Sequence, residues 1–303
     1  MSLETHKENK AIPQVNNIFL LLMKQLRIKQ WTKNLLIFAV LIFSLDHFSV
    51  MNLVNTVIGF ILFCFVSGSV YILNDYVDIE ADKIHPTKKN RPMASGELNP
   101  TFTLLFGVAL LTFSLIMSLF LSYLFTIVLV VYFIINVLYS FKLKEVVIID
   151  IMIIAAGFVL RALAGGLIID VNITPWFLLC TLLLSLFLAI GKRRNELFIL
   201  NTESTSHRKV LAKYNMMLLD QLMVIVATST IICYSMFTFS SGRTIHLMWT
   251  IPLVIYGVFR YLYLVHVEEK GGSPDRILLE DKHIFYTVIL YVLVVLVILI
   301  TFE

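Results

Sequence analysis

The sequence predicts an all-α polytopic membrane protein with about nine transmembrane helices. Of its 303 residues, 59% are hydrophobic and only 15% are charged, and the mean hydropathy is +0.88. An average soluble domain is far less apolar. Most of the apolar runs reach the roughly 20 residues that a helix needs to cross a bilayer, although the first and the sixth are shorter. The runs lie near residues 35–45, 53–73, 102–121, 124–139, 146–169, 176–190, 216–239, 247–265 and 284–302.

Lysine and arginine are concentrated in alternate loops, which predicts the orientation of the chain. If the N-terminus is cytoplasmic, the inner loops hold nearly all of these residues and the outer loops hold only Arg243. By the positive-inside rule, we expect a multi-pass protein of the plasma (inner) membrane whose longer, charged loops face the cytoplasm. The net charge of +4 reflects these inner loops and predicts no nucleic-acid partner.

The chain divides into a short tail and one membrane domain. Residues 1–15 are polar and predict a disordered cytoplasmic tail without a cleavable signal peptide. Residues 16–303 are expected to form a single transmembrane domain. Its first part, 16–30, has apolar residues at helical spacing and predicts an amphipathic helix at the inner interface. Lys33 lies in the basic flank that follows, where it either sets the topology or contacts a substrate.

Acidic side chains are concentrated at the end of the second apolar run. At about 100° per residue, Asn74, Asp75, Asp78 and Asp82 fall within a roughly 100° arc of a helix, and Glu80 points the other way. Such a face suits Mg²⁺, which takes oxygen ligands and typically uses one or two carboxylates together with the oxygens of a bound phosphate. The sequence therefore predicts a Mg²⁺ and phosphate site here.

A basic run follows the acidic residues directly. Lys83, His85, Lys88, Lys89 and Arg91 could bind the remaining negative charge of a phosphorylated ligand. Proline and glycine in residues 91–100 predict a turn-rich loop that folds back over the site. The simpler alternative is a solvated loop of mixed charge between two spans.

Further polar residues lie in or beside the later spans. Asp150 is near the start of the fifth span, and Arg161 is eleven residues further on, on nearly the same face. An arginine within a span is costly and normally faces a polar interior, so this span is predicted to line a cavity unless Arg161 reaches outward. The other candidates for substrate binding, which could instead only set the topology, are Tyr139, Lys144, Lys192, Arg193, Arg194 and Arg260.

These separated motifs resemble those of the UbiA superfamily of intramembrane prenyltransferases. Residues 74–82 match its Asn-Asp-x-x-Asp-x-x-x-Asp signature, and residues 139–144 resemble its Tyr-Ser segment with a nearby lysine. The resemblance implies nine transmembrane helices around a central cavity that opens to the cytoplasmic side and to the bilayer. Many members carry a second Asp-rich motif after the sixth span, whereas the corresponding residues here, 192–194, are basic.

Within that superfamily, the basic second motif is similar to the branch of decaprenyl-phosphate phosphoribosyltransferases. Residues 30–34, 82–92, 160–166 and 260–261 also resemble that branch. The resemblance implies transfer of 5-phosphoribosyl from phosphoribosyl diphosphate to a polyprenyl phosphate, with release of diphosphate. On this hypothesis the catalytic residues are three aspartates that hold Mg²⁺ with Asn74, and the basic residues neutralise the substrate phosphates. The three aspartates are Asp75, Asp78 and Asp82.

Two other functions are alternatives. A UbiA-type prenyltransferase would move a prenyl group from a prenyl diphosphate to an aromatic, quinone-precursor or haem acceptor. A membrane transporter would line a solute path with Asp150, Arg161 and the acidic helix end. The transporter is disfavoured because the charge gathers at one membrane face and no inverted pair of interrupted helices is visible.

Overall fold

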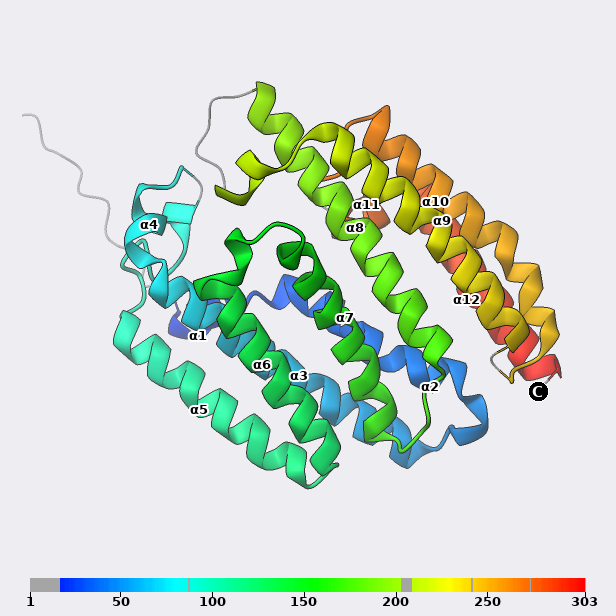
Figure 1. The fold of residues 1–303 in the computed structure, drawn as a ribbon. Helices are drawn as coiled ribbons and strands as arrows, with labels where there is room; N and C mark the ends of the chain where they lie inside the picture. Colours follow the sequence, from blue (N-terminus) through cyan, green and yellow to red (C-terminus); the bar gives the residue numbers. More distant parts are fainter. Residues whose placement is uncertain (1–16, 87, 203–208, 241, 273, 303) are drawn as a thin grey trace, which may run out of the picture.

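The computed structural model describes residues 17–86, 88–202, 209–240, 242–272 and 274–302. The expected tail, 1–15, lies outside the described residues. Within them the chain is all-helical and contains no strand (Figure 1). The helices are α1 (Ile18–Gln25), a 3-10 helix (Ile28–Phe38), α2 (Ala39–Phe43), α3 (Val50–Val77), α4 (Ile79–Ile84), α5 (Pro100–Leu119), α6 (Tyr123–Phe141), α7 (Ile149–Ile168), α8 (Pro175–Thr202), α9 (Met216–Ser240), a 3-10 helix (Ile245–Thr250), α10 (Ile251–His266), α11 (Pro274–Glu280) and α12 (Lys282–Phe302), with shorter 3-10 turns between some of them.

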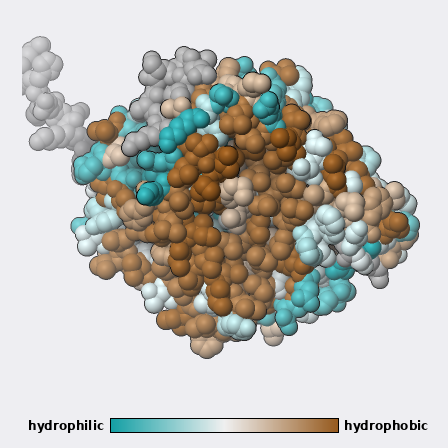
Figure 2. Space-filling view, in the orientation of Figure 1, coloured by the Kyte–Doolittle hydropathy of each residue, from teal (hydrophilic) through white to brown (hydrophobic). Residues whose placement is uncertain are grey.

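Eight helical segments of the described chain are long and apolar enough to cross a membrane. They are α3, α5, α6, α7, α8, α9, α12 and the continuous segment Ile245–His266, and they coincide with eight of the nine predicted apolar runs. The all-α polytopic fold is therefore confirmed, and the chain is a multi-pass membrane protein. Exposed apolar side chains cover a wide face of the molecule (Figure 2), which implies contact with bilayer lipid.

The first predicted run, 35–45, is not an ordinary membrane helix. It begins within the 3-10 helix Ile28–Phe38 and continues through the short helix α2. A 3-10 helix rises about 2.0 Å per residue and an α-helix about 1.5 Å, so the apolar residues 35–43 extend about 16 Å. This is about half the thickness of the hydrocarbon core of a bilayer.

Helix α7 is shared by the two largest parts of the apolar core. Its first half packs with α8, α9 and α10, and its second half packs with the first 3-10 helix, α3 and α6. Gly165 allows the close approach on that second side, because a Cβ atom there would lie 2.2 Å from the carbonyl oxygen of Ile37. In Figure 1, α7 accordingly runs between α6 and α8.

Arg161 on α7 is buried and ties this packing together. Its Nε donates to Asn34 Oδ1 (2.7 Å), and its Nη2 donates to Tyr132 Oη (2.9 Å). Its guanidinium also lies over the rings of Phe63 and Phe158. Arg161 therefore does not reach outward to the membrane interface. The residues around it are amides, carbonyls and aromatic rings of the helices it joins.

Removing the acceptor of Arg161 should destabilise the fold. In Asn34→Leu the buried guanidinium loses the acceptor of its Nε, which should lower the free energy of unfolding by about 1–3 kcal/mol. The measurement is the midpoint of thermal unfolding of the purified protein in detergent. Asn55→Leu, on the half-buried face of α3, is the matched control and should shift the midpoint little. Equal midpoints for the two variants would contradict this role of Arg161.

Candidate functional site

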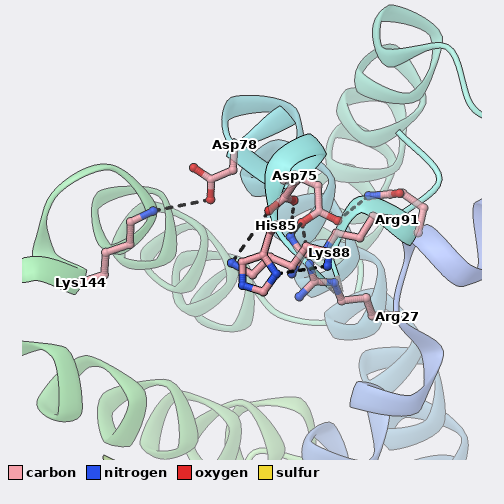
Figure 3. A network of polar contacts seen from close by, with 9 residues as sticks. Arg27, Asp75, Asp78, His85, Lys88, Arg91 and Lys144 are labelled. Atoms are coloured by element: carbon pink, nitrogen blue, oxygen red, sulfur yellow. Dashed lines mark hydrogen bonds and ion pairs between the residues drawn. The ribbon is translucent and has the colours of Figure 1, made fainter. Parts of the chain in front are cut away.

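The acidic face predicted for residues 74–82 is split by a break in the helix. Helix α3 ends at Val77, Asp78 adopts a non-helical conformation (φ −92°, ψ 8°), and α4 starts at Ile79. The backbone nitrogen of Asp78 donates to the carbonyl oxygen of Asn74, and that of Asp82 donates to the carbonyl oxygen of Asp78. These bonds connect the end of α3 to α4 across the break. Figure 3 shows Asp78 turned toward Lys144 and away from Asp75. Asp75 and Asp82, on either side of the break, both contact Arg91.

Asp75 is buried and accepts hydrogen bonds from three side chains. Its Oδ1 accepts from Arg27 Nη2 (2.5 Å) and from Arg91 Nη1 (2.8 Å). Its Oδ2 accepts from Gln25 Nε2 (2.8 Å). Arg27 has left-handed backbone (φ 53°) at the turn that follows α1, and its guanidinium also lies over the ring of Tyr71. The end of α1 is therefore part of the acidic site.

One nitrogen atom joins the two buried carboxylates. Arg91 Nη1 lies 2.8 Å from Asp75 Oδ1 and 2.5 Å from Asp82 Oδ2. The loop that carries Arg91 is anchored from the other side, since Leu21 of α1 packs against Met93 and Leu98. The predicted folding of this loop over the acidic residues is thus visible in its contacts.

The position of Arg91 Nη1 between Asp75 and Asp82 indicates whether these two carboxylates could also bind Mg²⁺. Two carboxylates that both contact one cationic atom can also converge on a metal ion, and Mg²⁺ often uses one or two carboxylates plus substrate phosphates. Asp78 instead pairs with Lys144 Nζ (3.6 Å). Within the described part of the chain, no group of three or more His, Cys, Asp or Glu side chains could hold a metal by itself. Asp75 and Asp82 fit a Mg²⁺ site that the substrate completes.

A cavity of about 290 Å³ opens beside Asp75. Four cationic side chains line it together with Gln25 and Asp75, and these cations are Lys24, Arg27, Lys88 and Arg91. Arg91 and Lys88 also pair with Asp82, so four positive charges face two carboxylates and leave an excess of positive charge. The cavity can therefore bind an anion that carries several phosphate oxygens.

Other predicted substrate-binding residues lie in different places. Lys83 is exposed and pairs with Glu80 (2.6 Å), so it points away from the cavity. The ring of His85 accepts from the backbone nitrogen of Lys88 (3.4 Å). Lys33 is half-buried on the first 3-10 helix. Arg260 pairs with Asp281 (2.7 Å) at the junction of α10 and α12.

The basic motif 192–194 is part of helix α8, which continues well beyond the predicted apolar run 176–190, and is not the loop expected after the sixth span. Arg193 is 1% exposed, and its Nε donates to Asp150 Oδ2 (2.7 Å). It also contacts Glu196 (2.6 Å) and Tyr139 (3.3 Å). Arg194 contacts Asp220 (2.6 Å). The two arginines are thus used in internal contacts, because a buried guanidinium needs a nearby acceptor.

Tyr214 completes the group around Asp150. Its hydroxyl donates to Asp150 Oδ1 (2.7 Å) and accepts from the backbone nitrogen of Ile148 (2.7 Å). Burial raises the pKa of the Tyr214 phenol, and so does the Asp150 carboxylate. The phenol therefore keeps its proton at physiological pH. Asp150 and Arg161 are both on α7 but belong to separate polar groups.

Sequence reasoning missed four residues of these groups: Gln25, Arg27, Tyr214 and Asp220. Gln25 and Arg27 lie in the amphipathic stretch and its basic flank, where their types are ordinary. The left-handed turn at Arg27 has no glycine or asparagine to mark it. Tyr214 and Asp220 lie far from residues 192–194 in the sequence, and no local pattern marks them as partners of this motif.

The chain is similar to several known proteins over most of its length. The model of the UbiA prenyltransferase family matches residues 35–289. The decaprenyl-phosphate phosphoribosyltransferase of Mycolicibacterium smegmatis is 32% identical, with 92% of this chain and 93% of that protein covered. The protein of the same name from Corynebacterium glutamicum is 34% identical, with 91% and 86% covered.

Solved structures show the same fold. A UbiA homologue from Archaeoglobus fulgidus bound to GPP and Mg²⁺ has a TM-score of 0.70 at 18% sequence identity, with 93% of this chain and all of that chain covered. A digeranylgeranylglyceryl phosphate synthase has a TM-score of 0.67 at 20% identity, with 92% and 97% covered. The family match, the relatives and the shared fold lead to one conclusion: this chain belongs to the UbiA prenyltransferase family.

Proposed function

We propose that this UbiA-family transferase moves 5-phosphoribosyl from phosphoribosyl diphosphate to a polyprenyl phosphate and releases diphosphate. The relatives named above support this reaction by their names and by identities of 32% and 34% over most of the chain. The observation that carries the proposal is the cavity beside Asp75, whose four cations outnumber the two carboxylates that they contact, Asp75 and Asp82. That excess of positive charge suits a donor with a phosphate at each end better than a prenyl diphosphate.

The internal pairing of Arg193 and Arg194 also supports placing the donor in this cavity rather than beside α8. The chain has basic residues where many family members carry a second acidic cluster, and the two arginines contact Asp150, Glu196 and Asp220. We therefore assign the donor to the cavity beside Asp75. Of the basic residues predicted to bind phosphate, Lys88 and Arg91 line that cavity.

In the proposed reaction, Asp75 and Asp82 would hold Mg²⁺, with the donor diphosphate supplying further oxygen ligands. Mg²⁺ would offset the negative charge that grows on the departing diphosphate. The bond between the ribose anomeric carbon and the diphosphate oxygen breaks, and a new bond forms from that carbon to an oxygen of the lipid phosphate. The lipid phosphate is already anionic near neutral pH, so no general base is needed. Lys144, next to Asp78, can attract this second phosphate.

The membrane setting follows from the same assignment. The isoprenoid tail of the acceptor would lie among the apolar spans, and its phosphate would reach the end of α3 where the acidic residues lie. We propose that this end faces the cytoplasm of a cell whose plasma membrane holds the protein, because the basic loops are on this side. Residues 16–303 would act as one transmembrane unit.

Transfer of label to lipid should reveal the reaction. Purified protein with Mg²⁺, a polyprenyl phosphate and phosphoribosyl diphosphate labelled in the ribose should move label into the organic phase, and EDTA should stop the transfer. The measurement is organic-phase radioactivity over time. If the protein instead left this donor intact and joined geranyl diphosphate to an aromatic acceptor, the prenyltransferase alternative would replace the proposal.

The metal assignment predicts a change in the Mg²⁺ requirement. Asp82→Asn removes one carboxylate from the proposed site, so the Mg²⁺ concentration for half-maximal activity should rise about tenfold or more. Asp46→Asn is the matched control. Asp46 also pairs with an arginine, Arg243 (3.2 Å), but it is exposed and lies far from residues 74–91 in the sequence. Size-exclusion profiles should confirm that both variants fold. An unchanged Mg²⁺ dependence in Asp82→Asn would remove Asp82 from the metal site.

A further inference from the structure

Gln25 has a buried oxygen atom without a hydrogen-bond partner. The residue is 1% exposed, and its Nε2 donates to Asp75 Oδ2 (2.8 Å). Because a carboxylate can only accept, this contact fixes which end of the amide is the nitrogen. The other end, Oε1, has no partner in the structure. A buried polar atom that is left unpaired is costly, so such an atom in a native protein calls for an explanation.

Gln25 also lines the cationic cavity beside Asp75. The lining residues thus combine donors that suit phosphate with carboxylate and amide acceptors, and among these acceptors Gln25 Oε1 has no partner. Phosphate oxygens at neutral pH mostly accept hydrogen bonds, so a phosphate group cannot satisfy Oε1. A ligand that satisfies both the cations and Oε1 must carry a hydrogen-bond donor close to its phosphate group. A sugar hydroxyl is such a donor, and the isoprenoid chain of a prenyl diphosphate or a polyprenyl phosphate has none.

We propose that Gln25 Oε1 accepts a hydrogen bond from a ribose hydroxyl of a phosphoribosyl ligand, while the cations of the cavity bind its phosphate. This inference rests on the proposed function and extends it, since it makes Gln25 a residue that determines donor specificity. Gln25 is well placed for this task. Its amide nitrogen is held by Asp75, its neighbour Leu21 is packed in a small apolar cluster, and Arg27 continues the same wall of the cavity.

The hydroxyl preference of the wild-type protein is the first test. Full-length protein in nanodiscs, with EDTA and no added metal, is titrated with ribose 5-phosphate and with tetrahydrofurfuryl phosphate, which keeps the ring and phosphate but lacks the hydroxyls. Ribose 5-phosphate should bind about tenfold more tightly, because only it can satisfy Oε1. Equal affinities would overturn the proposal, whether or not any variant folds.

The second test assigns that preference to Gln25. In Gln25→Met the tenfold preference should fall to nearly one, through weaker binding of ribose 5-phosphate, while binding of the hydroxyl-free compound stays within about threefold of wild type. Gln221→Met, at an exposed glutamine of α9, is the matched control and should keep the full preference. If Gln25→Met retained the tenfold preference for ribose 5-phosphate, Gln25 would be excluded as its source.

The outcomes separate this proposal from the proposed function. If the wild-type protein transfers labelled phosphoribosyl to lipid but shows no hydroxyl preference that depends on Gln25, only the role of Gln25 is wrong. If the protein neither binds ribose 5-phosphate nor consumes phosphoribosyl diphosphate, the assignment of the donor is wrong and the role of Gln25 is excluded with it.

Discussion

The site depends on two buried carboxylates that share one cationic nitrogen. Asp75 and Asp82 lie on either side of the break at Asp78, and Arg91 Nη1 contacts both of them. Buried carboxylates repel each other and lose hydration, so they stay together only when a cation lies between them. This constraint fixes the loop that carries Arg91, the packing of α1 on that loop, and the cavity that forms between them.

Four arginines of the inner side form two groups, which differ in their partners. Arg193 and Arg194 contact carboxylates within the protein and stabilise the junction of α7, α8 and α9. Arg27 and Arg91 also contact Asp75, yet they line a cavity that a ligand can enter. An anion that enters can compete with Asp75 for them and can share Mg²⁺ with it. We interpret the first group as structural and the second as the binding surface for the donor.

Much of the fold could be predicted because the local composition of the sequence indicates where membrane helices lie. Eight apolar runs became the eight candidate spans, and residues 74–91 were predicted to gather acidic and basic groups at one place, where Asp75, Asp82 and Arg91 do meet. Contacts between distant segments could not be predicted in the same way. Gln25 reaches Asp75 across 50 residues, and Arg193 reaches Asp150 across 43. Such pairs are set by helix packing, which leaves no periodic signal in the chain.

A structure of the full-length protein in nanodiscs with Mg²⁺ and phosphoribosyl diphosphate would test the central claim most directly. The account predicts a metal ion shared by Asp75, Asp82 and the donor diphosphate, with the rest of the donor in the cavity lined by Gln25 and Arg27. Arg91 Nη1 should have moved from its position between the two carboxylates. Density for the donor beside Lys192 on α8, with the bridge at Arg91 intact, would contradict the account.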